Sequence, residues 1–540
     1  MKKILLILIV VLAFVLRFYQ LDSYPALNAD EAAIGYNAYS LIQTGKDEHG
    51  NPWPIHFQSF NDYKPGLYFY LVLPFVKVMG LNEWAVRIPG ATLGVLTVLV
   101  LYFLVKELFK NEKLALISAF FLSISPWHIH FSRGGWEVNA ATFFITVGVW
   151  LFLKGLKNPK LMAISFISFV ASLYTYHAAR IAVPLLGLSL IIFNWGEIKK
   201  NLKIFIILGL IASIFLFPLV IDLTKGSITS RAAGVGLFAD LGPFSRINEQ
   251  RGEHNDFSGL IAKVIHNKPV NYGLAFLGNW TKHFWGEFLF LSGDEIQRNK
   301  VPETGQMYLF DFIFIVIGFI FIAKNFKTGW KIVFSWLLIA PLASALTFQS
   351  PHALRAQNMV IPLVIISAYG LTSLLSLIKE KIKIKNLERV IWGIIGLLIL
   401  WNFGRYLHMY YIHMAKEYPY SSQYGLKELV SYVKENGERF EKIIVTNRYD
   451  QPYILFLFYL KYPPAKFQAE HTLTGKDNYG FSTVPNFGKY YFGEINFSKT
   501  QPENPNSLIV GTDEEIPKEA NIIKDIYGTN GYRYFRIVAN

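Results

Sequence analysis

The chain contains no cysteine, and only 17% of its 540 residues are charged. The lack of cysteine excludes disulfide frameworks, thiolate metal sites and cysteine nucleophiles. Soluble domains carry about a quarter charged residues, whereas here 52% of the residues are hydrophobic and 16% are aromatic. A soluble globular protein is therefore excluded. A disordered chain is excluded as well, because so apolar a sequence can offset its ordering entropy.

Acidic residues are fewer than basic ones, 38 against 52, and the formal net charge is +14. An excess of cations can indicate a nucleic-acid partner, so the position of the cations decides the matter. They lie between long apolar runs and do not form one patch. The charge is therefore typical of membrane topology, and no nucleic-acid partner is predicted.

The apolar runs predict about eleven membrane-spanning helices, because each can cross, or nearly cross, a hydrocarbon core of about 30 Å. They begin near residues 4, 86, 114, 139, 160, 180, 203, 306, 332, 355 and 389. The first run follows Met1-Lys2-Lys3, and no small-residue cleavage site follows it before Gln20. We therefore expect a retained anchor in place of a cleaved signal peptide.

Short basic connections predict the orientation of the chain. They are Lys106–Lys113, Lys154–Lys160, Lys199–Lys203, Lys324–Lys331 and Lys379–Arg389. The positive-inside rule puts them in the cytoplasm together with the N-terminus. A first outer loop at 20–85, a large outer loop at 223–305 and the C-terminal tail then lie outside. We expect a multi-pass protein of the cell (inner, cytoplasmic) membrane.

Two domains are predicted, a transmembrane domain at 1–415 and an extracytoplasmic α/β domain at 416–540. In the first outer loop we expect short helices at Ala32–Ile42 and Leu67–Met79, the second of them lying in the membrane interface. The α/β domain is predicted from helical patterns at Leu426–Val433 and Tyr453–Leu460 and from strand patterns at Lys442–Thr446, Ser507–Val510, Ile522–Tyr527 and Tyr532–Val538. The stretch Gln468–Pro505 is expected to be irregular.

Polar residues that could carry chemistry are concentrated in the predicted outer connections, where charge is less costly than in lipid. They are Asp30, Glu31, Lys64, Arg133, His177, Arg180, His352 and Arg355. An acidic pair facing cations at the outer boundary suits transfer of a group from an anionic lipid headgroup. A carboxylate can accept the proton of an incoming hydroxyl, while cations stabilise the departing phosphate.

Each of these residues also has a plainer interpretation. Asp30 can cap the helix that follows, with Glu31 favourable in its first turn. The lysine and the arginines can be interfacial side chains at span ends, and the lone histidines can be hydrogen-bonded packing residues. His128 and His130 could bind a metal, but the His-x-His spacing is a weak signal.

The segment Asn28–Glu31, with the following Tyr36-Asn37-Ala38-Tyr39-Ser40-Leu41, resembles the GT-C membrane glycosyltransferases. The similarity is greatest to bacterial relatives of the dolichyl-phosphate-mannose protein mannosyltransferases (glycosyltransferase family 39), and more distant to the lipid A aminoarabinose transferases. It continues, in chain order, through Lys64-Pro65 with Leu67-Tyr68, Trp84–Pro89, Ser125–His128 with Phe131–Arg133, and Tyr176-His177 with Arg180. It covers residues 1–415.

This resemblance implies a polyprenyl-phosphate-linked sugar donor that enters from the outer leaflet, and inversion at the anomeric carbon. Asp30 matches the family's catalytic aspartate and Glu31 its acidic neighbour. Lys64 matches a lysine that contacts the lipid phosphate in the aminoarabinose branch. That branch has a glutamate before this lysine where the chain has Tyr63, so no metal and no other cofactor is predicted and the need for a divalent ion stays open.

The sequence therefore predicts a membrane glycosyltransferase that acts at an acceptor hydroxyl outside the cytoplasm, with Asp30 as general base. Lys64, Arg133, His177, Arg180, His352 and Arg355 are predicted to bind the phosphate or sugar of the donor. The acceptor is left open between a protein, a lipid such as lipid A and a glycan or cell-wall polymer. The alternatives are a lipid-linked sugar carrier that breaks no bond and a structural anchor for the outer domain.

Overall fold

The computed structural model describes residues 2–225, 234–254, 256–382, 384–421, 423–477 and 481–540. These residues form two compact units. Unit 1 comprises residues 1–16, 93–132 and 137–406, and unit 2 comprises residues 17–92, 133–136 and 407–540. The chain passes between the units several times, and three of these passages fall inside helices, namely α1 (Lys2–Phe18), α4 (Glu83–Phe109) and α20 (Lys385–His408). The predicted domain boundary at 415–416 stays a prediction.

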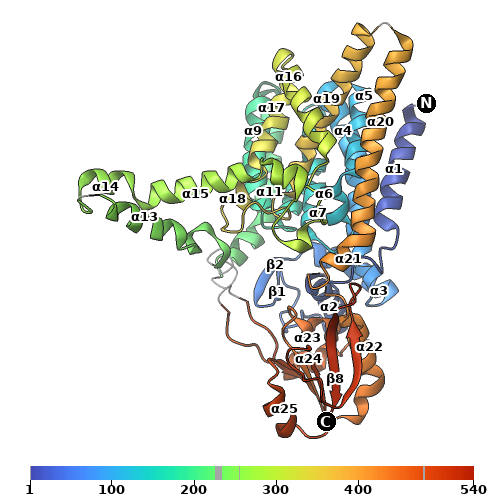
Figure 1. Ribbon diagram of the computed structural model, residues 1–540. Helices are drawn as coiled ribbons and strands as arrows, with labels where there is room; N and C mark the ends of the chain where they lie inside the picture. Colours follow the sequence, from blue (N-terminus) through green and yellow to red (C-terminus); the bar gives the residue numbers. More distant parts are fainter. Residues whose placement is uncertain (1, 226–233, 255, 383, 422, 478–480) are drawn as a thin grey trace. The chain divides into compact units, whose positions relative to one another are not determined.

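Unit 1 is built from long apolar helices, which Figure 1 shows as a bundle of near-parallel ribbons. Besides most of α1 and α4 it contains α5 (Glu112–Ile124), α6 (Pro126–Ser132), α7 (Glu137–Gly155), α8 (Pro159–Leu173), α9 (Ala179–Phe193), α10 (Trp195–Lys200), α11 (Leu202–Leu223), α16 (Leu309–Lys324), α17 (Thr328–Ile339), α18 (Leu342–Ala345), η4 (Gln357–Met359), α19 (Val360–Lys381) and most of α20 (Lys385–His408). Each predicted apolar run coincides with one of these helices.

Among the described residues, six helices are long and apolar enough to cross a membrane, or seven if the bent pair α5–α6 counts as one span. Helices α8 and α9 are apolar but shorter. The chain is a multi-pass membrane protein, while the count of eleven spans stays a prediction. Almost no residue of the apolar window of α11 or α20 is buried, as expected of helices that face lipid.

The large outer loop is mostly helical within its described part. It contains η1 (Leu237–Ala239), α13 (Gly242–Gly252), α14 (Leu260–Ile265), α15 (Lys268–Lys282), η2 (Glu287–Leu291) and η3 (Gln297–Asn299). Asn267 caps α15 by accepting a hydrogen bond from the Val270 amide at 3.0 Å. Residues 237–254 and 256–282, referred to below as the lateral arm, extend sideways from the bundle of unit 1 (Figure 1).

Unit 2 combines the first outer loop with a C-terminal sheet. The loop forms α2 (Ala29–Thr44), the antiparallel pair β1 (His56–Ser59) and β2 (Asp62–Pro65), and α3 (Leu67–Met79). The C-terminal part forms η5 (Met409–His413), α21 (Met414–Glu417), α22 (Leu426–Asn436), η6 (Gly437–Arg439), β3 (Lys442–Thr446), α23 (Pro452–Leu460), α24 (Pro464–Glu470), β4 (Asn486–Phe487), β5 (Tyr490–Gly493), α25 (Phe497–Glu503), β6 (Ser507–Gly511), β7 (Ile522–Tyr527) and β8 (Arg533–Ala539).

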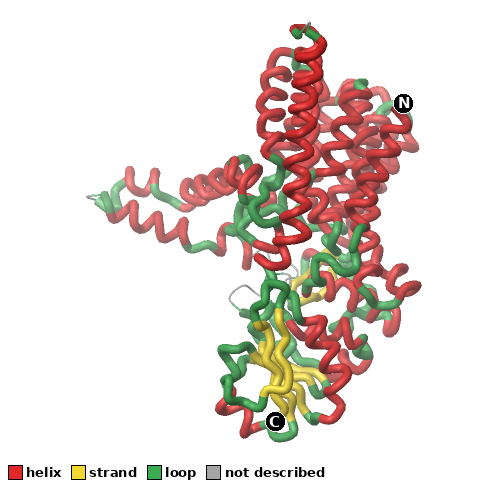
Figure 2. The backbone as a smooth tube through the Cα atoms, turned by 45° about the vertical axis from the view of Figure 1, so that its right-hand side comes forward, coloured by secondary structure: helices red, strands yellow, loops and turns green. Residues whose placement is uncertain are grey.

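The C-terminal strands form one six-stranded sheet in the order β4-β5-β3-β6-β8-β7, which Figure 2 shows in yellow. Strands β5, β3 and β6 are parallel, and the remaining neighbours are antiparallel. The small α/β domain predicted from sequence is therefore present. The expectation that Gln468–Pro505 is irregular is wrong, because this stretch supplies β4, β5 and α25.

Helix α2 is buried within unit 2 against α3, α23 and α24. A Cβ atom on Gly35 would lie 2.6 Å from the Phe458 ring and 2.7 Å from Val86 Cγ2, so only glycine permits this approach. The Tyr36 hydroxyl donates to the carbonyl of Tyr462 at 3.0 Å. The helix that carries the acidic pair is thus held by the C-terminal part of the chain.

Candidate functional site

The eight predicted site residues divide equally between the two units. Asp30, Glu31, Lys64 and Arg133 belong to unit 2. His177, Arg180, His352 and Arg355 belong to unit 1. The geometry of each group is therefore described within its own unit.

The acidic pair occupies the first turn of α2, and Asn28 precedes it as the N-cap. The Asn28 side chain accepts a hydrogen bond from the Glu31 amide at 3.0 Å, and the Glu31 carboxylate accepts one from the Asn28 amide at 3.3 Å. This reciprocal capping box satisfies amides that the helix leaves without partners. The plainer interpretation that Asp30 caps the helix is therefore wrong, because Asn28 does so.

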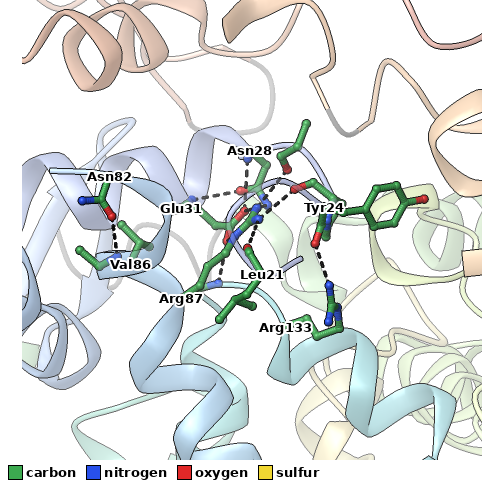
Figure 3. A network of polar contacts seen from close by, with 12 residues as sticks. Leu21, Tyr24, Asn28, Glu31, Asn82, Val86, Arg87 and Arg133 are labelled. Carbon is green, nitrogen blue, oxygen red and sulfur yellow. Dashed lines mark hydrogen bonds and ion pairs between the residues drawn. The ribbon is translucent and has the colours of Figure 1, made fainter. Parts of the chain in front are cut away.

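Glu31 is almost completely buried and forms an ion pair with Arg87 (Figure 3). Arg87 Nε lies 2.6 Å from Glu31 Oε1, and Arg87 Nη2 lies 2.7 Å from Oε2. Oε1 also accepts a hydrogen bond from the amide of Gly135 at 2.9 Å. With both oxygens engaged in a buried pair, this carboxylate is poorly suited to accept a substrate proton and well suited to hold the loops around it.

Arg87 extends the same network to the segment that enters α2. Its guanidinium donates to the carbonyls of Leu21 and Pro25 at 2.9 Å each and to that of Ala26 at 3.2 Å. This arginine lies within the Trp84–Pro89 motif, and no role was predicted for it. The signal that could have found it is an arginine inside an apolar helix, which needs a buried partner.

Asp30 lies in a different environment from its neighbour. Its side chain is 23% exposed and pairs with Lys64, whose side chain is 9% exposed. The Lys64 ammonium also lies 5.2 Å from the centre of the Phe60 ring. Strand β2 therefore brings to the start of α2 a cation predicted from sequence. Of the two acidic side chains, Asp30 is the more exposed.

Arg133 is completely buried in unit 2 and is held by the chain on either side of it. It donates to the carbonyls of Tyr19 at 2.7 Å and Tyr24 at 3.0 Å and to the Tyr410 hydroxyl at 3.1 Å. Its guanidinium also lies 5.4 Å from the rings of Tyr410 and Tyr411. These contacts make it an organiser of the segment before α2, and its predicted contact with the donor stays a prediction.

Unit 1 contains a pocket of about 420 Å³ to which three of the predicted residues contribute, namely His177, Arg180 and Arg355. Arg180 Nη1 lies 3.0 Å from His177 Nδ1, and Arg355 donates to the Thr347 hydroxyl at 2.7 Å. The rest of the lining is mostly apolar and includes Ile181, Leu223, Val235, Leu237, Phe238 and Leu346. Two guanidinium groups in an apolar wall suit an amphiphile with an anionic head.

His352, the fourth predicted residue of unit 1, is not among the described residues that line this pocket. Its Nδ1 lies 3.7 Å from Asp294 Oδ2, and the same oxygen accepts a hydrogen bond from the amide of Ala353 at 2.6 Å. Burial raises the pKa of Asp294, while hydrogen bonds from the backbone amides of Ile296 and Ala353 oppose the rise. Asp294 therefore fixes the loop from which Arg355 reaches the pocket, a role that the sequence analysis missed.

A second buried carboxyl in unit 2 was also missed. Glu48 follows α2, and its Oε1 accepts a hydrogen bond from the Asn37 side chain at 3.2 Å. Burial raises its pKa to about 8, although the Asn37 amide and the Lys64 ammonium oppose the rise. His49 Nδ1 lies 2.8 Å from His471 Nε2, and burial lowers the pKa of His49 to about 3. The consecutive Asp47, Glu48 and His49 were the available signal.

The histidine and carboxylate side chains bear on whether the chain could hold a metal ion. His130 Nε2 lies 2.9 Å from the carbonyl oxygen of Arg298, a contact typical of a packing histidine. Within the described ranges, no three His, Asp or Glu side chains converge as metal ligands.

Part of the chain is similar in sequence to a known protein family. Residues 7–221 match the family described as dolichyl-phosphate-mannose-protein mannosyltransferase. An uncharacterized protein of Aquifex aeolicus is 29% identical over 160 residues, and the Bacillus subtilis protein YkcB is 26% identical over 164 residues. These matches cover 30% and 29% of this chain but only 31% and 23% of the relatives, so the chain aligns with less than a third of each.

Two solved structures resemble the fold over most of the chain. ArnT from Cupriavidus metallidurans bound to undecaprenyl phosphate has a TM-score of 0.52 at 13% identity, covering 99% of this chain and 97% of that one. The oligosaccharyltransferase AglB from Archaeoglobus fulgidus, in complex with an inhibitory peptide and a dolichol-phosphate, has a TM-score of 0.53 at 13% identity, covering 85% and 63%. The resemblance expected from sequence is thus confirmed, and at these identities what the chain shares with ArnT and AglB is the fold.

Proposed function

We propose that this chain, whose residues 7–221 match the dolichyl-phosphate-mannose-protein mannosyltransferase family, is a membrane glycosyltransferase. It moves a sugar from a polyprenyl-phosphate carrier to an acceptor hydroxyl on the extracytoplasmic side. The observation that carries the proposal is the environment of Asp30, an accessible carboxylate in the first turn of α2 beside Lys64. The ArnT and AglB structures hold undecaprenyl phosphate and dolichol-phosphate respectively, which supports a carrier of that class here.

In the proposed step the acceptor oxygen attacks the anomeric carbon of the donor and passes its proton to Asp30. The bond between that carbon and the phosphate oxygen breaks, and the electron pair leaves with the polyprenyl phosphate. The configuration of the sugar inverts because attack and departure occur on opposite faces. The Lys64 ammonium favours the ionised form of Asp30 and can stabilise the charge that develops on the phosphate.

Glu31 and Arg87 act as positioning residues in this scheme. Their ion pair and the hydrogen bond from Gly135 fix the first turn of α2, and Asp30 is the neighbouring residue on that turn. A base must lie within hydrogen-bond reach of the proton that it removes. A rigid first turn therefore contributes to the rate without contacting the substrate.

The unit 1 pocket is proposed to bind the donor lipid. Arg180 and Arg355 supply positive charge, and the apolar lining accepts isoprenoid carbons. A long prenyl chain gains about 25 cal/mol for each Å² of apolar surface removed from water, so such a pocket can contribute to affinity independently of the chemistry. His177 is proposed to orient the Arg180 guanidinium through their 3.0 Å contact.

The test is transfer of radiolabelled sugar from a polyprenyl-phosphate donor by purified protein in detergent or nanodiscs. Asp30→Asn preserves size but cannot accept the proton, and we expect transfer to fall by about 10² to 10⁴ while donor binding persists. In the same assay Arg180→Gln is expected to weaken donor binding more than it lowers the maximal rate.

Glu441→Gln is the matched control, because Glu441 belongs to the same unit and its side chain is exposed. It should transfer at the wild-type rate. Full transfer by Asp30→Asn would remove Asp30 from its role. Label that crosses the membrane but stays on the lipid would indicate a carrier and overturn the proposed reaction. Protein, lipid and glycan acceptors offered in parallel separate the possible acceptors.

A further inference from the structure

The lateral arm of unit 1 is the largest feature that the proposed reaction does not use. Figure 1 shows it leaving the bundle at a large angle to helices such as α9 and α17, with α15 on the side of the bundle and α13 on the opposite side. Helices α13 and α15 pack against each other. The arm therefore has two layers, and α15 forms the layer on the side toward which the spanning helices extend (Figure 1).

Hydrogen bonds hold the base of the arm at the ends of spanning helices. The Leu237 amide donates to the carbonyl of Leu346 at 2.8 Å, and Trp280 Nε1 donates to that of Leu338 at 3.0 Å. The side chain of Asn279 donates to the carbonyl of Thr347 at 3.0 Å. The arm therefore leaves the bundle near the end of the candidate membrane span Thr328–Ala345.

The outer part of the arm exposes an unusual amount of apolar surface. In α14, Leu260 is 79% exposed and Ile261 is 67% exposed. In α15, Leu274 is 62% exposed, and Val270 and Leu277 lie exposed on the same face at the spacing of one helical turn. Contiguous apolar surface of this kind normally marks a site that contacts a membrane or a protein.

The acidic residues of the arm all precede residue 257, whereas basic residues occur throughout. Residues 257–282 contain Lys263, Lys268 and Lys282 but no aspartate or glutamate. Helix α13, by contrast, carries Glu249, which pairs with Arg246 at 2.7 Å. The apolar face and its lysines thus lie in α14 and α15, while this carboxylate lies in the layer on the other side.

We propose that the lateral arm lies in the headgroup layer of the bilayer, with the apolar faces of α14 and α15 in contact with acyl chains and their lysines paired with anionic headgroups. Helices with an apolar face flanked by lysine bind membranes in this way. The bilayer is favoured over a second copy of the chain as the partner, because a symmetric contact between two copies of this face would bring lysines together.

The proposed position of the arm also determines where the pocket of unit 1 opens. Leu237 and Phe238, at the base of the arm, line that pocket together with Arg180 and Arg355. If the arm lies on the bilayer, the pocket opens at the level of the lipid headgroups. An amphiphile could then pass from the membrane into the pocket without crossing water.

The absence of cysteine makes the test direct, because a single introduced cysteine carries the only label. Leu260→Cys and Leu274→Cys, with Glu253→Cys directly after α13 as the matched control, are labelled with an environment-sensitive fluorophore in full-length protein in nanodiscs. Bromine on the acyl chains should quench the labels at 260 and 274 and leave the label at 253 unaffected, whereas aqueous iodide should do the reverse. Iodide access at 260 and 274, or shielding from both quenchers, overturns the proposal.

The charge component is tested with Lys263→Gln and Lys268→Gln combined in the Leu274→Cys protein. Two lysines near an anionic surface contribute about 1 kcal/mol each to membrane binding. Their loss should therefore lower the ratio of lipid-bound to water-exposed arm by about 30-fold in anionic nanodiscs. Zwitterionic nanodiscs should show no difference between the two proteins. An equal response in both lipids would overturn the role of the lysines.

Discussion

Two neighbouring carboxylates in the same helical turn serve different purposes in this protein. Successive residues of an α-helix point about 100° apart, so Asp30 and Glu31 meet different surroundings. Glu31 points to Arg87 and Gly135, and burial with these partners holds it in place. Asp30 stays partly exposed beside Lys64. The chemistry that the sequence assigned to the pair is therefore proposed for Asp30 alone.

The buried carboxyl of Glu48 should make the stability of the folded protein depend on pH. An unfolded glutamate titrates near about 4.3, whereas burial raises the pKa of Glu48 in the folded chain to about 8. Between these values the folded state binds the extra proton, so this carboxyl lowers stability as the pH rises through that range. Glu48→Gln does not titrate. We expect its melting temperature to rise relative to wild type from pH 5 to pH 8 and the difference then to level off.

The measurement is thermal unfolding of both proteins in detergent at a series of pH values. His49 Nε2 lies 3.8 Å from Glu48 Oε1, but burial lowers the pKa of His49 to about 3, so His49 stays neutral from pH 5 to pH 8. Glu441→Gln, at an exposed position of unit 2, is the control and should give a curve parallel to wild type. A constant difference between wild type and Glu48→Gln would contradict the buried, protonated state.

At the scale of elements, close packing of helices depends on glycine. Helices α16 and α19 approach so closely that a Cβ atom on Gly370 would lie 1.8 Å from the carbonyl oxygen of Phe314. Small residues allow such contacts between membrane helices. The apolar run alone located α19, but it did not reveal this contact.

Gly370→Ala should therefore force α16 and α19 apart. Overpacking typically costs about 1–3 kcal/mol, and we expect a lower melting temperature in detergent. Gly393→Ala is the matched control, because a Cβ atom on Gly393 in α20 meets nothing within 4 Å. Equal melting temperatures for the two variants would show that the close contact is not maintained.

Elements were predictable where their pattern is local. The apolar helix α3 begins and ends at the predicted residues Leu67 and Met79, and strands β3 and β7 also have the predicted bounds. Strand β5 (Tyr490–Gly493) was missed because four residues carry too little pattern of their own. Its conformation depends on parallel pairing with β3, more than 40 residues earlier in the chain.

At the scale of the whole molecule, the orientation in the membrane is a prediction from the basic connections. With no native cysteine, it can be tested by single cysteines at two exposed positions, Lys157→Cys in a connection and Lys518→Cys in the C-terminal domain. In intact cells a membrane-impermeant maleimide should label position 518 and should label position 157 only after the membrane is opened. The opposite pattern would put the acidic pair in the cytoplasm and contradict the proposed reaction.

The amino-acid sequence alone was enough to predict a multi-pass membrane protein, because the length of an apolar run and the charge beside it are local properties, and its motifs carried the resemblance to membrane glycosyltransferases. It also indicated Asp30 and Lys64, which β2 and α2 bring together. Only the tertiary structure decided that Glu31 is engaged by Arg87, that Arg133 is bound to backbone carbonyls and that Arg180 and Arg355 share a pocket. Those roles depend on burial and on partners far away in the chain, which no local pattern contains.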